Sequence, residues 1–200
     1  TSTNFNGKPL IAYSDAKTSI LKIAIWDGKI WIGLGSATNT IAYSLDATSW
    51  TSAPNSTSIF STSGYGGNWF EKNNLYVISG SGTNTIAISY NGIDWIGLGT
   101  TIFSTASYSV TSNNNLLLAL GSGTNTIAYS STGLVWTGLG TTIFSTVGKC
   151  IIWDSSKFIA VGQGTNTIAY SFNGTLWTGI GVTIFSTSGN SIAYNGFNQY

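Results

Sequence analysis

The chain has 200 residues, a formal net charge of +1 and only 6% charged residues, against roughly 25% in an average soluble domain. Hydrophobic residues make up 42% of it, so the composition excludes a disordered chain and predicts one domain, residues 1–200, with a sizeable core. Histidine, arginine and methionine are absent, which removes the most common groups of acid–base catalysis, of zinc binding and of phosphate recognition.

The sequence repeats itself with a period of about 41 residues. The run T-N-T-I-A begins at Thr38, Thr83, Thr124 and Thr165, and I-F-S-T runs and single tryptophans recur with nearly the same period. In the last complete copy, short β-branched and aromatic runs cover residues 150–153, 158–161, 167–171 and 176–180, separated by turn residues. We expect four antiparallel strands and no helix in each repeat, which is the content of one β-propeller blade.

The blade count follows from the positions of the repeats, which lie near 21–60, 65–103, 106–144 and 147–185. Counted through both termini, Trp177 and Trp50 are 73 residues apart, short of two periods. One further blade therefore has to be shared by the two ends, residues 188–200 plus 1–15. We predict an all-β, five-bladed propeller whose closing blade lacks about eight residues, including its second strand. Because the chain begins at Thr1 and has no methionine, we expect it to be a piece of a longer protein.

The turn between the third and fourth strands reads S-L-D-A-T-S-W, S-Y-N-G-I-D-W, S-S-T-G-L-V-W and S-F-N-G-T-L-W. This resembles the Asp-box of sialidase-type and BNR-repeat propellers, and whole units resemble repeat propellers of large DNA viruses, phages and environmental sequences. The resemblance implies a structural role for Trp50, Trp95, Trp136 and Trp177, and the N-G pairs of the turns predict a tight two-residue hairpin. It implies no sialidase activity, because sialidases grip their substrate with an arginine cluster that this chain does not have.

Alternating strand direction predicts two rims. The first rim carries the connections from second to third strand and from blade to blade, and it is uncharged, rich in hydroxyl groups and nearly identical in every repeat. Its amides, hydroxyls and aromatic rings form a candidate sugar-binding surface, which comprises Asn39, Asn84, Asn125, Asn166, Thr38, Thr83, Thr124, Thr165, Phe60, Phe103, Phe144 and Phe185. The alternative is that the Asn and Thr side chains bond to their own loops and that the phenylalanines belong to the core. The second rim carries most of the charge and has the character of a solvated face.

These observations lead to two hypotheses for the function. One is a non-catalytic module that recognises neutral glycans through the repeated rim, with avidity from several weak sites. The other is a structural or assembly module of a virion or cell surface, whose partners are copies of itself or a larger particle. We expect no enzymatic activity, cofactor or metal, no nucleic-acid partner, since there is no basic patch, and no membrane insertion, since no apolar run approaches the length of a span. The single Cys150 lies in an apolar run and is expected to be a buried side chain.

Overall fold

The computed structural model describes residues 4–5, 8–9 and 20–194, which form an all-β protein with antiparallel strand pairing. Each complete repeat folds into a four-stranded meander, here called a blade. The strands of the first and second blades are β3 (Ile20–Trp26), β4 (Trp31–Ser36), β5 (Ile41–Ser44), β6 (Thr51–Ser52), β7 (Ser63–Phe70), β8 (Leu75–Ser81), β9 (Ile86–Ser89) and β10 (Ile96–Gly97). Those of the third and fourth are β11 (Ala106–Ser112), β12 (Leu117–Ser122), β13 (Ile127–Ser130), β14 (Thr137–Gly138), β15 (Val147–Trp153), β16 (Phe158–Gln163), β17 (Ile168–Ser171) and β18 (Thr178–Gly179).

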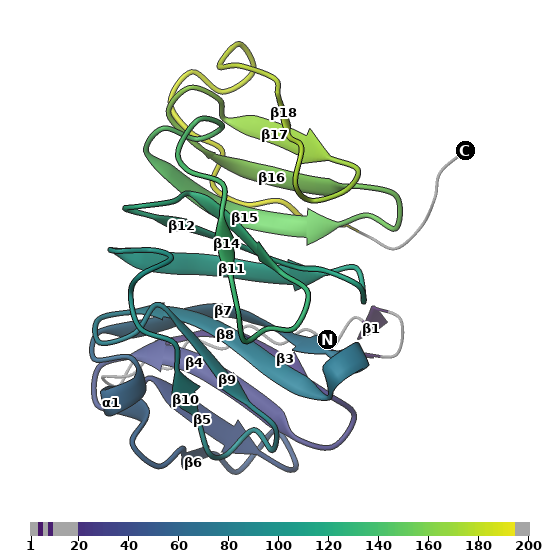
Figure 1. Cartoon of the computed structure of the whole chain (residues 1–200). Coiled ribbons are helices and arrows are strands. Elements are labelled where there is room, and N and C mark those ends of the chain that lie inside the picture. Colours follow the sequence, from purple (N-terminus) through teal and green to yellow (C-terminus); the bar gives the residue numbers. More distant parts are fainter. Residues whose placement is uncertain (1–3, 6–7, 10–19, 195–200) are drawn as a thin grey trace.

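The blades are stacked face to face, and their first strands run side by side along one axis (Figure 1). Strand β3 lies beside β7, β7 beside β11, and β11 beside β15. Single residue pairs also join neighbouring sheets, Ser36 with Ser63 and Ser81 with Ala106. This is the architecture of a β-propeller, so the fold class predicted from the repeats is confirmed.

The core consists of three apolar layers, one between each pair of successive blades. Successive side chains of a strand point to opposite faces of its sheet, and β12 shows the consequence. Leu117 and Ala119 pack in the layer shared with the second blade, whereas Leu118 and Leu120 pack in the layer shared with the fourth. The continuous apolar run of β12 thus reflects a strand that is covered on both faces.

Short helical turns depart from the all-strand expectation. The helix α1 (Ser56–Ile59) lies in the connection from the first to the second blade, where the sequence period is 45 residues instead of 41. The 3-10 turn η1 (Glu71–Asn73) joins β7 to β8. The backbone groups of an irregular connection are satisfied by local i→i+3 and i→i+4 hydrogen bonds. Turns this short have no apolar periodicity, so the sequence pattern does not predict them.

The beginning of a fifth blade is also visible. Ser188 pairs with Gln163, and the Gly189 N–H donates to the Gly162 carbonyl. A Cβ on Gly189 would collide with Val161 as one on Gly148 would with Leu120, so residues 188–190 enter the fold as the earlier first strands do. At the other end, β1 (Asn4–Phe5) pairs with β2 (Lys8–Pro9) in a hairpin. The rest of the predicted closing blade, residues 1–3, 6–7, 10–15 and 195–200, lies outside the described residues, and the count of five blades stays a prediction.

Candidate functional site

The repeated asparagines of the first rim hold the blades together from within. In the third blade, the Asn125 side-chain amide donates to the Ile102 carbonyl at 2.7 Å and accepts from the Gly140 N–H at 2.8 Å. Asn84 and Asn166 make the same two bonds, to Ile59 and Gly99 and to Ile143 and Gly181. Each half-buried amide therefore ties the incoming connection to the last strand of its own blade, which leaves little of it for a ligand.

A glycine in the last strand of each blade makes room for this amide. A Cβ at Gly97, Gly138 or Gly179 would overlap the side chain of Asn84, Asn125 or Asn166. The first blade has Ser52 at that position, opposite Ala42, and its asparagine differs accordingly. Asn39 is exposed, and its Oδ1 accepts a bond from the Ser52 hydroxyl at 2.7 Å.

The four threonines that precede these asparagines, Thr38, Thr83, Thr124 and Thr165, are exposed as expected. The backbone N–H groups of the last three donate to serine hydroxyls of the neighbouring connection, Ser61, Ser104 and Ser145. Their side chains remain at the surface, so the first rim does present a repeated row of hydroxyl groups.

The expectation of exposed phenylalanines is wrong for Phe60, Phe103 and Phe144, which are fully buried. Each ring lies against the glycine of the next blade's second strand, Gly80, Gly121 or Gly162, where a side chain would clash. These rings belong to the layers between blades and cannot stack on a sugar. Phe185 alone of the four is exposed, at 45%, because it points to the face of the fourth blade on which a fifth would lie.

The Asp-box-like turns stabilise the end of each blade. In the first blade, the Asp46 carboxylate accepts from the N–H groups of Ser49 and Thr48, and these bonds hold the pKa of Asp46 well below its ordinary value. The turn is wider than the tight hairpin expected, since the last paired residues are Tyr43 and Thr51 and their equivalents. A serine hydroxyl, an Asp, Asn or Thr side chain and a residue with positive φ close it instead.

The recurring tryptophans pack against the preceding blade. Trp95 and Trp136 are buried in two of the layers between blades, and Trp177 packs against the third. Trp50 is 39% exposed, because the blade that would precede it is the predicted closing blade. The indole N–H of Trp50, Trp136 and Trp177 donates to a carbonyl within its own turn.

The innermost strands carry a feature that the repeat comparison did not single out. Each of β3, β7, β11 and β15 has a β-bulge after its second residue, and the bulge residues are Lys22, Tyr65, Tyr108 and Lys149. Asn190 follows Gly189 as Lys149 follows Gly148, so it is the fifth member. We call these five residues the axial set. Bulges re-aim side chains and are frequent beside functional sites. The repeats did not mark these positions, since the residues on either side of them also differ from blade to blade.

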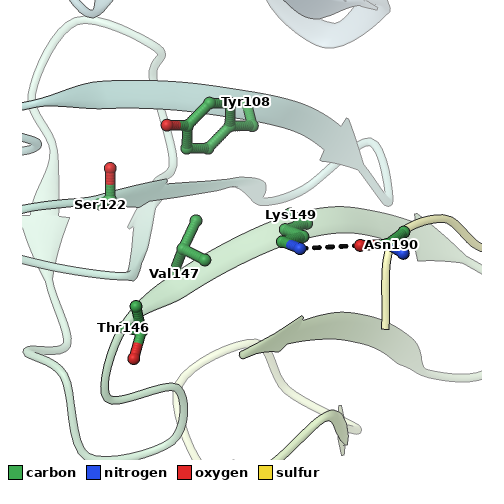
Figure 2. Close-up of a pocket in the computed structure, with 6 residues that line it drawn as sticks. All are labelled: Tyr108, Ser122, Thr146, Val147, Lys149 and Asn190. Carbon is green, nitrogen blue, oxygen red and sulfur yellow. Dashed lines mark hydrogen bonds between the residues drawn. The ribbon is translucent and has the colours of Figure 1, made fainter. Parts of the chain in front are cut away.

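Two pairs within the axial set are in contact, Tyr65 with Tyr108 and Lys149 with Asn190. The rings of Tyr65 and Tyr108 are 5.1 Å apart, and the Lys149 ammonium donates to Asn190 Oδ1 at 2.7 Å. Between these two pairs lies an open hollow of about 540 Å³ on the first rim. Figure 2 shows its lining, which is Tyr108, Ser122, Thr146, Val147, Lys149 and Asn190 from β11, β12, β15 and the chain after the fourth blade. We take this axial hollow as the candidate functional site.

The carboxylates that the structure describes lie away from this hollow. Asp27 and Asp154 each accept two backbone N–H bonds in the turn from first to second strand, on the second rim. Partial burial raises the pKa of Asp154, but bonds from the Lys157 ammonium and from the N–H groups of Lys157 and Ser156 lower it further, so the pKa lies well below its ordinary value. Within residues 20–194, no three His, Cys, Asp or Glu side chains gather where they could hold a metal ion. In the same part of the chain, no helix is long and apolar enough to span a membrane.

No protein-family model matches the sequence, and no curated protein matches it. Solved structures do resemble the fold. The nidogen/laminin complex matches 93% of this chain and 72% of its own chain, with a TM-score of 0.67 and 12% identity. The extracellular domain of the one-component system BT4673 from B. thetaiotaomicron matches 90% of this chain with a TM-score of 0.61 and 14% identity, and the Niastella koreensis GH74 enzyme matches 82% with 0.53 and 16%.

The chain spans only 24% of the BT4673 chain and 30% of the GH74 chain. At these identities the likeness shows a propeller fold and nothing finer.

Proposed function

We propose that this chain is a non-catalytic binding module that takes a carbohydrate in the axial hollow of its first rim. The observation that carries the proposal is the set of unused polar groups around this hollow. Within the described residues, the hydroxyls of Tyr108, Ser122 and Thr146 and the amide nitrogen of Asn190 make no hydrogen bond. Ligand sites are typically concave and combine a few convergent polar groups with apolar surface, here the Tyr108 ring and Val147.

The rest of the first rim favours the axial hollow, rather than the repeated T-N-T loops, as the binding site. The amides of Asn84, Asn125 and Asn166 are occupied by backbone groups, and three of the four phenylalanines are buried. The aromatic ring that lines the hollow is that of Tyr108, which pairs with the ring of Tyr65.

The absence of catalysis is part of the proposal. A reaction at the hollow would need an acid or base within hydrogen-bond reach of the bound ligand. The described carboxylates lie in turns of the second rim, where Asp27, Asp46 and Asp154 accept bonds from their own turn backbone.

A glycan array tests the proposal. We expect the folded protein to bind sugars, the double variant Tyr108→Ala/Asn190→Ala to lose binding, and the rim variant Thr83→Ala/Thr124→Ala/Thr165→Ala to retain most of it. Binding lost only in the rim variant would return the site to the repeated loops. A folded wild-type protein that binds no sugar contradicts the proposal.

The second candidate function, an assembly module, is favoured by the open face of the fourth blade. Ile180, Val182, Ile184 and Phe185 are exposed there, at 50%, 43%, 66% and 45%. A second copy of the chain is the occupant we propose for this exposed apolar face, because two such faces brought together would bury these side chains. Sedimentation of the full chain decides the question: a dimer that Ile184→Asp dissociates supports assembly, and a monomer at high concentration argues against it.

A further inference from the structure

The charges of this protein are distributed unevenly between its two rims. Eight of the charged side chains that the structure describes lie in turns of the second rim: Asp27, Lys29, Asp46, Glu71, Lys72, Asp94, Asp154 and Lys157. The remaining one, Lys149, is half-buried and lines the axial hollow on the first rim. Among the described residues it makes no ion pair, and its one hydrogen bond goes to the neutral Asn190.

The groups around Lys149 are short of hydrogen-bond acceptors. Asn190 Oδ1 already accepts from the Lys149 ammonium and from the Ser188 hydroxyl at 3.0 Å. Its amide nitrogen, two of the three Lys149 N–H groups and the hydroxyls of Tyr108, Ser122 and Thr146 remain as donors. A cation surrounded by spare donors favours a ligand group that accepts several bonds and carries negative charge.

We propose that the axial hollow binds an acidic carbohydrate, a sugar that carries a carboxylate or sulfate group. The acidic group is held by the Lys149 ammonium and the Asn190 amide nitrogen, and the sugar ring lies against the Tyr108 ring. This proposal rests on the proposed function and narrows its ligand class from carbohydrates in general to anionic sugars.

The apolar side of the hollow distinguishes a sugar from a free anion. Tyr65 and Tyr108 form a tilted aromatic pair, and Val147 lies on β15 next to Lys149. Such a surface contributes by burying the C–H face of a ring, which an inorganic anion does not have. The hollow has a volume of about 540 Å³, which lies in the usual range for small-ligand sites and is enough for one or two sugar residues.

A matched pair of ligands tests the charge requirement. Trigalacturonic acid and its methyl ester differ in charge and hardly in shape. Titration calorimetry measures the affinity of each ligand for the wild-type protein, Lys149→Gln and Lys72→Gln. Lys72 is an exposed lysine of the second rim, so its variant controls for loss of net charge. We expect the acid to bind wild type and Lys72→Gln, with about tenfold to a hundredfold weaker binding to Lys149→Gln and to the ester.

The other outcomes separate this inference from the proposed function. Equal binding of acid and ester, unaffected by Lys149→Gln, overturns the inference and keeps the carbohydrate site. If neither ligand binds, an array of sulfated, sialylated and neutral glycans follows: neutral sugars bound alone overturn the inference, and no sugar bound overturns both. Binding of poly-glutamate without any acidic sugar also overturns it, in favour of an acidic protein partner.

Discussion

The repeated asparagine of the first rim provides the sharpest test of how the blades are joined. Asn125→Ala removes the bond to the Ile102 carbonyl and the bond from the Gly140 N–H, and leaves both backbone groups without their partner. A neutral hydrogen bond is worth about 0.5–1.5 kcal/mol net, and an orphaned buried group costs more. Since water reaches part of this half-buried site, we expect unfolding free energy to fall by about 2–3 kcal/mol.

The assay is urea unfolding followed by tryptophan fluorescence, together with the melting temperature. For a chain of this size, 1 kcal/mol corresponds to about 2–4 °C, so Tm should fall by about 4–12 °C. Thr124→Ala is the matched control, because Thr124 is the exposed neighbour of Asn125 and its side chain makes no bond. We expect it to change stability by less than about 0.5 kcal/mol.

A third variant separates the two bonds. Asn125→Asp keeps the acceptor for the Gly140 N–H but sets a carboxylate oxygen against the Ile102 carbonyl, so it should be destabilising at neutral pH and milder in acid. If Asn125→Ala and Thr124→Ala have the same stability within about 0.5 kcal/mol, the amide does not join the blades and the reasoning fails.

Three further predictions follow from the same packing. Gly138→Ser should displace the Asn125 amide and lower Tm nearly as much as Asn125→Ala, with little extra loss in the double variant. Phe144→Ala should cost about 3–5 kcal/mol by chemical denaturation, and Phe185→Ala less than about 1.5, because Phe144 is fully buried and Phe185 is 45% exposed; equal losses would contradict this reasoning. The pKa of Asp154 is lowered in the folded protein, so this carboxylate stabilises the fold above the ordinary aspartate pKa of about 4, and the stabilisation is lost as the pH falls below that value. Tm of Asp154→Asn should therefore fall less between pH 5 and pH 3 than Tm of wild type. Parallel curves of Tm against pH would contradict this.

The fold was accessible from sequence because the repeats carry it. Four runs with strand composition per period, each ended by turn residues, predict four-stranded blades, and the observed strands β15 to β18 overlap all four expected ranges. The hydrophobic pattern could not say which face of each strand meets which blade, because strands such as β12 are apolar on both faces.

The site was less accessible for a specific reason. Because the rim loops are nearly identical, Asn84, Asn125 and Asn166 were predicted to bind a ligand. A structural role requires the same identity, since each amide has to fit against a glycine of the last strand. The glycine at Gly97, Gly138 and Gly179, replaced by Ser52 in the blade whose asparagine is exposed, was the sequence signal for that role. The axial set offered no comparable signal, because the first strands that carry it differ from repeat to repeat along most of their length.

The two ends of the described chain point to one missing neighbour. A tryptophan packs against the blade before it and a phenylalanine against the blade after it, and both are buried wherever that neighbour is present, as for Trp136 and Phe144. Trp50 and Phe185 are the two members left open, one on each outer face of the stack. A closing blade made of both termini would meet Trp50 on one side and Phe185 on the other. Since the hollow ends at Asn190, where that blade begins, closure and the axial site depend on the same segment of chain.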